Sequence, residues 1–367
     1  MTIIHVSTAT SWRGGEQQIA YLLNGLREAG IQQLVICPAG SPLWQYCRQQ
    51  DFPFVSYVKK SSLGLFTARK VARLCKQDKN IIVHAHDSHA HTMVWLSAVL
   101  FSNKAPIIVH RRVDFPVKDS WFSLKKYNYN GIKRFICVSH AIREVLIKAL
   151  KKPEKAVVIH SGINLQRFEK VENEHFLRQE FGLTKDHILV GNVAALADHK
   201  DYPTFLQTAA LLCQEDDRFR FIIIGEGELW PEIEQFIADH DLGNRVFMTG
   251  FRRIVPQLLP DLDIFFMPSK LEGLGTSVLD AFAAGIPVVS TFAGGIPELV
   301  THKVSGLLAQ PGDYRQMADH IRRLADDDVL RANLVQNASA RVKEMDYRGM
   351  TDKTLSVYKE ILAEPIR

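Results

Sequence analysis

Short runs of apolar residues alternate with amphipathic stretches along the whole 367-residue chain. The apolar runs fall at residues 3–6, 33–37, 54–58, 81–84, 107–109, 135–138 and 156–159, and then at 188–193, 219–224, 246–249, 264–267, 288–290 and 306–308. Stretches with helical spacing of their apolar positions separate many of these runs, for example at 17–29, 65–76, 141–150, 202–214, 229–240 and 314–325. Such repeated strand–helix units predict parallel sheets with helices on both faces.

Two such series predict an α/β chain of two doubly wound, Rossmann-like domains with a cleft between them. The length is comfortable for two domains. A polar segment at 166–174 marks the boundary, which gives domains at residues 1–168 and 169–345. Ligands of doubly wound sheets bind at the carboxyl ends of the strands. The loops that follow the predicted strands are therefore where chemistry is expected.

The segment 271–290 carries the most informative of these loops. Glu272 opens a loop that holds Gly273 and Gly275, and a helix-like stretch follows with a second carboxylate, Asp280. Glycines before a helix start let backbone N–H groups and the positive end of the helix dipole meet a phosphate. Carboxylates nearby suit the hydroxyl groups of a sugar. The segment therefore predicts a nucleotide-sugar site.

Glycine-bearing loops follow three other predicted strands. Gly14 and Gly15 follow the first strand without the G-x-G-x-x-G pattern of nicotinamide or flavin sites. Lys200 follows the strand that contains Gly191 and could reach a diphosphate as a mobile charge, although most lysines before a helix are simply exposed. Gly225 lies in a strand-to-helix turn that is more typical of structure than of catalysis.

Charge divides unevenly along the chain. Residues 1–170 hold 25 Lys and Arg against 10 Asp and Glu, whereas residues 171–367 hold 20 against 30. A basic half indicates an anionic partner or only a solvated basic surface. No run reaches the length of a membrane span, the first residues do not resemble a signal peptide, and the five cysteines form no Cys-x-x-Cys pair. These features predict a cytoplasmic protein.

Taken in order, the motifs resemble the retaining glycosyltransferases of family 4, which have the two-domain GT-B fold. The matching pieces are GGEQQ at 14–18, SGINLQRF at 161–168, GNVAALADHKD at 191–201, GEGEL at 225–229, EGLGTSVLDAFAAGIPVVST at 272–291, GGIPELV at 294–300 and SGLL at 305–308. The resemblance implies a nucleotide-sugar donor, a glycan acceptor and no bound metal or other cofactor. The tail also resembles the closing helix of the family, so residues 346–367 are expected to pack on the first domain.

The resemblance implies roles for single residues. Glu272 matches an acid that contacts the donor sugar, and it is expected to orient the sugar rather than act as a nucleophile. Asp280 stands where the family usually has Glu on the ribose, and Ala195 stands where it usually has Arg on the diphosphate. One expected cation is therefore missing. The candidates to replace it are Arg111, Arg112 and Lys270.

The expected site has a catalytic, a donor-binding and an acceptor-side group. The expected catalytic residues are Glu272, Lys200, His110 and Arg112, and the expected donor-binding residues are Gly14, Gly15, Gly191, Lys200, Gly225, Glu272, Gly273, Leu274, Gly275, Thr276 and Asp280. The acceptor-side candidates are His86, Arg111, Arg112 and Asp114. No metal is expected at the histidines of residues 84–91, because the resembled family needs none and no second ligand set is visible.

The chemical class of the acceptor has to be inferred from the first half of the chain. Residues 118–134 there alternate basic and aromatic side chains. That pattern suits a membrane interface or an anionic glycolipid, or else a solvated helix with its aromatic residues packed inward. The chain is therefore expected to act in glycolipid or lipopolysaccharide-type synthesis at the inner face of the membrane. The alternatives are a nucleotide-sugar epimerase of the same fold and a catalytically weak nucleotide-sugar-binding protein. Nucleic acid is not an expected partner, because no recognition motif accompanies the basic half.

Overall fold

A computed structural model describes residues 1–58, 64–78, 80–169 and 171–364. The chain forms two compact units. Unit 1 comprises Met1–Gly162 and Tyr347–Arg367, and unit 2 comprises Ile163–Asp346. The chain thus leaves unit 1 shortly before the boundary that the sequence suggested at residues 168 and 169. Lys170, within the polar segment, and residues 365–367, at the end of the expected closing helix, lie outside the described residues.

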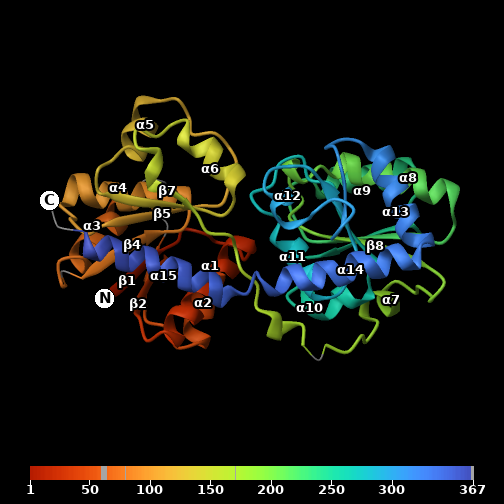
Figure 1. Cartoon of the computed structure of the whole chain (residues 1–367), viewed down its shortest axis with the longest axis horizontal. Coiled ribbons are helices and arrows are strands. Elements are labelled where there is room, and N and C mark those ends of the chain that lie inside the picture. Colours follow the sequence, from red (N-terminus) through yellow and green to blue (C-terminus); the bar gives the residue numbers. More distant parts are fainter. Residues whose placement is uncertain (59–63, 79, 170, 365–367) are drawn as a thin grey trace. The chain divides into compact units, whose positions relative to one another are not determined.

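Unit 1 is built on a parallel sheet in the order β3-β2-β1-β4-β5-β6-β7 (Figure 1). Its strands are β1 (Thr2–Val6), β2 (Gln32–Pro38), β3 (Phe54–Tyr57), β4 (Ile81–Ala85), β5 (Ile107–Arg111), β6 (Ile132–Cys137) and β7 (Ala156–Val158). Its helices are α1 (Gly14–Glu28), α2 (Pro42–Gln49), α3 (Leu65–Leu74), α4 (Ser88–Phe101), α5 (Trp121–Tyr127), α6 (His140–Ile147) and α15 (Tyr347–Ala363).

Unit 2 is built on a second parallel sheet, in the order β10-β9-β8-β11-β12-β13. Its strands are β8 (Ile188–Val193), β9 (Phe219–Ile224), β10 (Val246–Gly250), β11 (Ile264–Met267), β12 (Val288–Thr291) and β13 (Leu307–Ala309). Its helices are α7 (Phe176–Glu180), α8 (Tyr202–Glu215), α9 (Trp230–Asp239), α10 (Val255–Leu258), α11 (Thr276–Ala283), α12 (Ile296–Leu299), α13 (Tyr314–Asp326) and α14 (Asp328–Lys343).

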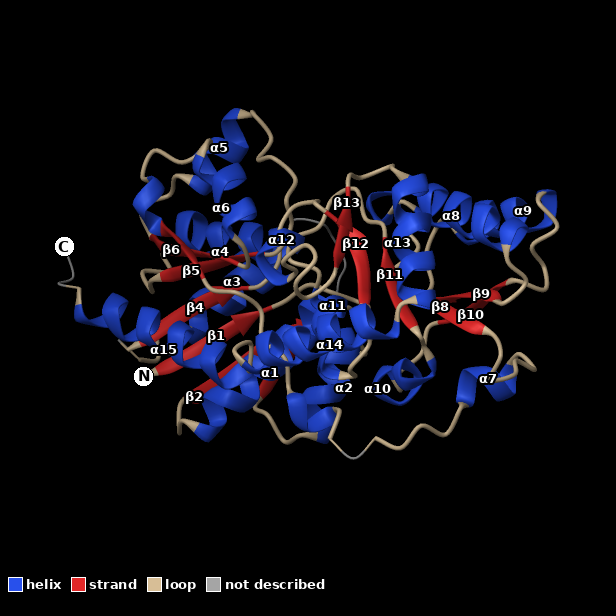
Figure 2. Ribbon diagram, turned by 45° about the vertical axis from the view of Figure 1, so that its right-hand side comes forward, coloured by secondary structure: helices blue, strands red, loops and turns tan. Residues whose placement is uncertain are grey.

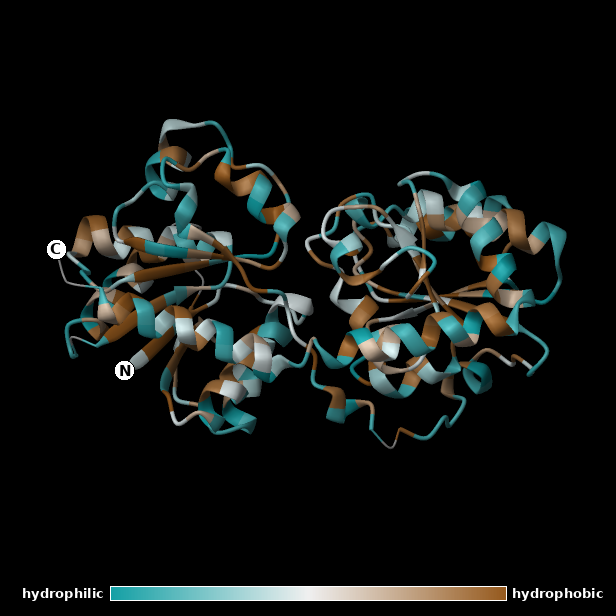
Figure 3. Cartoon of the chain, viewed as in Figure 1, coloured by the Kyte–Doolittle hydropathy of each residue, from teal (hydrophilic) through white to brown (hydrophobic). Residues whose placement is uncertain are grey.

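The predicted pair of doubly wound sheets is confirmed. Helices lie on both faces of the strands in each unit (Figure 2). The strands are hydrophobic along most of their length because both faces are covered (Figure 3). Helix α4 has no clear amphipathic pattern, since it is apolar on most sides and largely buried. Within the described residues, no helix has the length and apolar content to cross a bilayer.

The closing helix α15 completes the core of unit 1. It packs along α1, where the ring of Tyr347 stacks on Tyr21 with centroids 5.5 Å apart. The two helices approach so closely that a Cβ atom on Gly25 would lie 2.3 Å from the hydroxyl of Thr351. Tyr358, further along α15, is fully buried among residues of the sheet and α1. The far C-terminal segment is therefore a structural part of the first unit.

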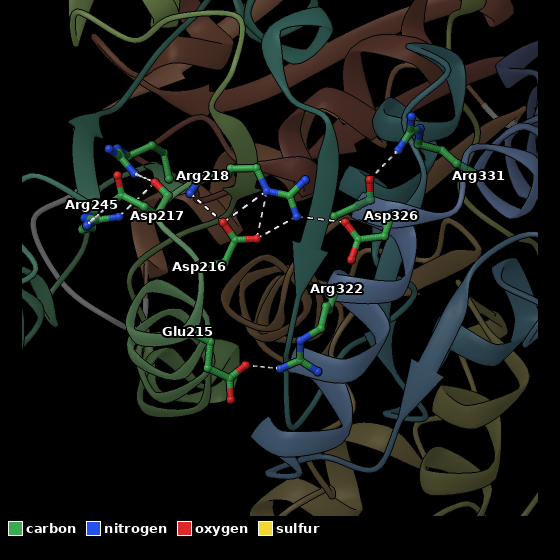
Figure 4. Close-up of polar contacts among 10 residues, drawn as sticks. Glu215, Asp216, Asp217, Arg218, Arg245, Arg322, Asp326 and Arg331 are labelled. Carbon is green, nitrogen blue, oxygen red and sulfur yellow. Dashed lines mark hydrogen bonds and ion pairs between the residues drawn. The ribbon is translucent and has the colours of Figure 1, made fainter.

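Charged side chains of unit 2 pair at the amino ends of its strands, opposite to the loops expected to carry chemistry. Arg218, just before β9, joins Asp216 at 2.7 Å and Asp326 of α13 at 2.9 Å (Figure 4). Arg322 of α13 pairs with Glu215 of α8 beside them. These side chains are partly exposed, so each pair contributes at most about 1 kcal/mol. Their effect is to fix the turn before β9 against α13.

We predict opposite outcomes for two glycine-to-alanine changes in the contacting helices. Gly25→Ala places a methyl group against Thr351 and is expected to lower stability by about 1–3 kcal/mol through overpacking. Gly349→Ala meets nothing within 4 Å and is expected to be neutral or stabilising by up to about 1 kcal/mol, because alanine favours helix. Thermal unfolding measures both, and equal stability of the two variants would contradict the packing described.

Candidate functional site

The sheet of unit 2 grows in two directions from its first strand. Strands β9 and β10 extend it on one side of β8, and β11, β12 and β13 extend it on the other. At such a switch point, the loops that follow the two adjacent strands run in opposite directions. The carboxyl edge of the sheet between them is therefore not covered. The loop after β8 leads to a 3₁₀ turn, Asp198–Lys200, and the loop after the neighbouring strand β11 leads to Glu272.

An ion pair joins these two loops. The Lys200 ammonium lies 2.5 Å from a carboxylate oxygen of Glu272, and the two side chains are 14% and 13% exposed. The backbone reinforces the contact, because the amides of Lys270 and Leu271 both donate to the carbonyl of His199. Lys270 also pairs with Asp198 at 2.8 Å nearer the surface. Two of the predicted catalytic residues are thus in direct contact at the switch point.

The Glu272 backbone rests against the turn before α12. The amide of Gly295 donates to the Glu272 carbonyl at 3.0 Å. A Cβ atom on Gly294 would lie only 1.8 Å from that carbonyl oxygen, so no larger residue fits there without moving the loop. The glycine pair of the GGIPELV motif therefore supports the position of Glu272.

Helix α11 begins directly after the Glu272 loop. Gly275 caps it with a left-handed backbone conformation, φ 85°, and Thr276 is its first residue. Gly273 and Leu274 complete the connection, with Leu274 buried. The first amides of an α-helix have no partner within the helix, and the dipole adds partial positive charge there. The start of α11 and Lys200 therefore supply two sources of positive potential beside one carboxylate.

Asp280 lies one turn along α11, on the same side of the helix as Thr276. Its side chain is half-buried. Burial raises the pKa of the Asp280 carboxyl to about 7, although the nearby Arg167 cation opposes the shift. The carboxyl is therefore partly protonated near neutral pH. A group of this kind can accept and donate hydrogen bonds to vicinal hydroxyl groups.

Two of the expected donor-binding glycines, Gly191 and Gly225, are closely packed against neighbouring residues of unit 2. Gly191 is inside β8, where the side chain of Leu262 fills the space that a Cβ would need. Gly225 follows β9 and lies against the carbonyl of Ala194, at the start of the loop that leads to Lys200. Their glycine identity is explained by packing. Ala195, in the same loop, carries no charge, and Lys270 is a cation of unit 2 held beside that loop.

The sheet of unit 1 has its own switch point, between β1 and β4. The predicted residues of this unit lie after β1, after β4, and at the end of β5 or in the loop that follows it. Helix α1 begins at Gly14, and a Cβ atom on Gly15 would lie 3.7 Å from the Arg112 side chain. The guanidinium of Arg112 donates to the His86 carbonyl at 2.8 Å. It also lies 3.4 Å from Nδ1 of His86 and 3.3 Å from Nδ1 of His110.

A buried network of histidines continues from Arg112 into the sheet. Nε2 of His86 lies 2.9 Å from Nδ1 of His5, and Nδ1 of His84 lies 2.6 Å from the Tyr358 hydroxyl. Burial lowers the pKa of His5 to about 3 and lowers the pKa of His84, His86 and His110 well below the usual range. Burial also lowers the pKa of Arg112, to about 10. At neutral pH the network therefore holds neutral imidazoles around one cation.

The hydrogen-bond donors set the tautomers of this network. Arg112 can only donate, so Nδ1 of His86 accepts and its proton lies on Nε2, where it points at His5. Nitrogens of His5, His84 and His86 lie within 4.8 Å of one another and could in principle hold a metal ion. A metal would have to displace the His86 proton beside a fixed cation.

The remaining predicted residues of unit 1 lie apart from this network. Arg111 is buried and turned toward its own loop, where it donates to the Tyr127 hydroxyl at 2.7 Å and to the Phe115 carbonyl. Asp114 lies in the same loop and is partly buried. His91 packs edge-on against Tyr127. His91 and the exposed His89 thus do not join His84 and His86, so the histidines at 84–91 do not form one ligand set.

Two members of the network, His5 and Tyr358, are not among the predicted site residues. His5 lies opposite His84 in the register of β1 and β4, so pairing the two predicted strands could have found it. Tyr358 comes from α15, and no local signal connects it to a residue far away in the sequence.

Comparison with known proteins gives two family matches. The family model "Glycosyltransferase Family 4" matches residues 12–167, and "Glycosyl transferases group 1" matches residues 173–341. A UDP-Gal:alpha-D-GlcNAc-diphosphoundecaprenol alpha-1,3-galactosyltransferase of Escherichia coli is 26% identical over 381 residues, which cover 93% of this chain and 96% of that protein. An N-acetyl-alpha-D-glucosaminyl L-malate synthase of Bacillus anthracis is 25% identical over 308 residues, covering 83% and 80% of the two chains.

Solved structures share the fold of the whole chain. Anabaena HepE in complex with UDP and glucose superposes with a TM-score of 0.86 at 22% identity, covering 98% of this chain and all of that one. A glycosyltransferase from Rickettsia africae gives a TM-score of 0.84 at 20% identity, covering 99% of each chain. The two family models span successive parts of the sequence and the two sheets match the fold, so the chain belongs to the family 4 type of glycosyltransferases with the GT-B fold.

Proposed function

We propose that this enzyme transfers a sugar from a UDP-sugar, or another nucleoside-diphosphate sugar, to a hydroxyl group of a lipid-linked glycan, with retention of the anomeric configuration. The observation that carries the proposal is the Lys200–Glu272 pair beside the start of α11 at the switch point of unit 2. The E. coli relative is named for a UDP-galactose donor and a diphosphoundecaprenol acceptor, which supports both substrate classes.

The donor half of the proposal follows from charge. Cleavage of the bond between the sugar and the diphosphate leaves negative charge on the diphosphate and positive charge on the anomeric carbon. Lys200 and the first amides of α11 would stabilise the departing diphosphate, and Glu272 would orient the sugar. Asp280 would bind the ribose from the same helix. No metal is then needed to neutralise the leaving group.

Retention requires that the acceptor oxygen attack from the face that the diphosphate leaves. The bond from the anomeric carbon to the phosphate oxygen breaks, the bond to the acceptor oxygen forms, and the acceptor proton passes to the departing diphosphate. This route needs no covalent nucleophile from the protein. It needs the acceptor hydroxyl to be held close to the anomeric carbon, because correct placement alone supplies a large part of the rate.

The acceptor half belongs to unit 1 in this proposal. Arg112 is the charged member of a neutral network at the carboxyl ends of its strands, and His86 and His110 hold it in place. A fixed guanidinium suits a phosphate or a sugar hydroxyl of the acceptor. A lipid-linked acceptor would bring the enzyme to the inner face of a membrane, in the synthesis of a cell-surface glycan or lipopolysaccharide.

The assay that tests this function incubates the protein with a UDP-sugar and a diphosphoundecaprenol-linked acceptor. We expect product only when both substrates are present. NMR should show that the transferred sugar has the same anomeric configuration in the product as in the donor. EDTA should not lower the rate. Conversion of the donor alone would point to an epimerase instead. An inverted anomer would contradict same-face attack.

Substitution of Glu272 should have different effects on the affinity for UDP and on kcat. In Glu272→Gln, Lys200 loses its ionic partner and is free to contact a diphosphate. We expect UDP, which lacks the sugar, to bind as tightly as to the wild type or a few-fold more tightly, while kcat falls about 10²–10³-fold. Titration calorimetry and initial rates measure the two effects. Weaker UDP binding with unchanged kcat would exclude the orienting role.

The pKa of Asp280 gives a pH-dependent prediction. Folding raises it from 3.8 to about 7, so the folded state favours the protonated form and loses stability as the pH rises between these values. Asp280→Asn removes this cost, and its gain in melting temperature over the wild type should be larger near pH 8 than near pH 4. Thermal unfolding across this range measures the difference, and a gain independent of pH would show that Asp280 does not titrate there.

A further inference from the structure

Unit 1 buries two cations that have no acidic partner. Arg111, the last residue of β5, is 7% exposed, and Lys126, in the last turn of α5, is 8% exposed. Among the described residues, no carboxylate forms an ion pair with either side chain. Lysine and arginine are almost never buried this deeply unless an anion pairs with them.

The two cations lie beside one aromatic ring. The Arg111 guanidinium carbon lies 5.7 Å, and the Lys126 ammonium 5.3 Å, from the centre of the Tyr127 ring. Arg111 also donates to the Tyr127 hydroxyl at 2.7 Å, and Lys126 donates to the Thr92 hydroxyl of α4 at 3.0 Å. Burial, and secondly the charge of Arg111, lowers the pKa of Lys126 to about 8. Lys126 is therefore still mostly charged at neutral pH, and the two like charges repel each other.

Unused hydrogen-bond donors surround the same ring. His91 of α4 is fully buried and packs edge-on against Tyr127, with ring centroids 4.9 Å apart. The backbone of Lys126 approaches His91, but within the described part of the chain neither ring nitrogen completes a hydrogen bond. Nε of Arg111 is likewise buried without an acceptor. Buried polar groups are nearly always satisfied, so these donors indicate a ligand that carries acceptor atoms.

Other groups near the two cations do not neutralise them. Asp114 is the carboxylate closest to Arg111 in the sequence, yet one of its oxygens is itself buried without a hydrogen bond. The end of α5 brings only partial negative charge to Lys126. Water could satisfy the unused donors, but it could not neutralise two charges. An external anion is the partner that remains.

This group of side chains is separate from the histidine network that holds Arg112. Neighbouring residues of a strand face opposite sides of the sheet, so His110 and Arg111 diverge. Arg111 also donates to the Phe115 carbonyl, which ties the loop after β5 to the group. We call the side chains around the ring, namely His91, Thr92, Arg111, Lys126 and Tyr127, the Tyr127 cluster.

We infer that the Tyr127 cluster binds a phosphate group. A phosphate carries one or two negative charges and several acceptor oxygens, which suit one guanidinium, one ammonium and one imidazole N–H. A carboxylate would offer the same donors only one charge and two oxygens. A metal ion would be repelled by the two cations.

The phosphate can come from two sources. It can be free in solution, or it can be the diphosphate of the lipid-linked acceptor, in which case the inference deepens the proposed function and rests on it. In the second case, the cluster would select acceptors by their phosphate, apart from the donor loops of unit 2.

The first test titrates the full chain with inorganic phosphate and pyrophosphate, and with acetate as a control, while UDP saturates the donor loops. We expect phosphate or pyrophosphate to bind, and Lys126→Met to weaken that binding about tenfold or more, because a charge-assisted contact is lost. Lys125→Met changes the exposed neighbouring lysine of α5 and is the matched control, which should leave binding unaltered. No binding, acetate binding as tight as that of phosphate, or equal effects of the two variants would overturn the inference.

Thermal unfolding distinguishes loss of the site from loss of the fold. Without phosphate, Lys126→Met should unfold at a higher temperature than the wild type, because an unpaired buried charge is removed. Thr92 keeps its hydrogen bond to the Ser88 carbonyl in that variant. Phosphate should stabilise the wild type but not the variant. A variant less stable than the wild type without phosphate would show that the Lys126 charge is already neutralised within the protein, and would overturn the inference.

Kinetics identify the source of the phosphate. If it belongs to the acceptor, Lys126→Met should raise the KM of a diphosphate-linked acceptor about tenfold relative to that of the same glycan on a phosphate-free linker. Equal changes in the two KM values, with phosphate binding lost, would assign the site to free phosphate. Absence of transfer to either acceptor by the wild type would refute the proposed function, whereas the titration would still test the cluster.

Discussion

The ion pair between Lys200 and Glu272 is the interaction on which this account depends. Each residue lies in the connection that follows one of two neighbouring parallel strands, β8 and β11, and the pair is mostly shielded from water. Removing one partner would leave the other charge partly buried and unpaired, which is costly. The pair therefore keeps both side chains at the carboxyl edge of the sheet until a ligand with its own charges can replace them.

Neighbouring glycines and the start of a helix hold the Lys200 and Glu272 loops in position. Gly294 and Gly295 fix the backbone of Glu272, and Gly225 lies under the loop that leads to Lys200. The start of α11 adds partial positive charge on the other side of Glu272. Unit 1 holds its cation without an ion pair to a carboxylate in that network. Burial keeps four histidines neutral there, so Arg112 is the cation of the network.

The sequence predicts the sheets better than it predicts the contacts. Continuous apolar runs located the strands because strands buried on both faces need no polar side. Glu272, Lys200, Gly275 and Asp280 could be grouped because the motif around them is local. Gly191 could be placed in a motif, but its close approach to Leu262 could not be predicted, because no pattern in the chain connects the two residues. Tyr358 and His5 could not be grouped with His86 without the register of β1, β4 and α15.

A structure of the protein with an intact UDP-sugar bound is the most direct test of the central claim. The account predicts that the diphosphate contacts Lys200 and the start of α11, that the sugar lies against Glu272, and that the ribose lies against Asp280. A nucleotide bound elsewhere, with the Lys200–Glu272 pair still closed and α11 without a ligand, would contradict it.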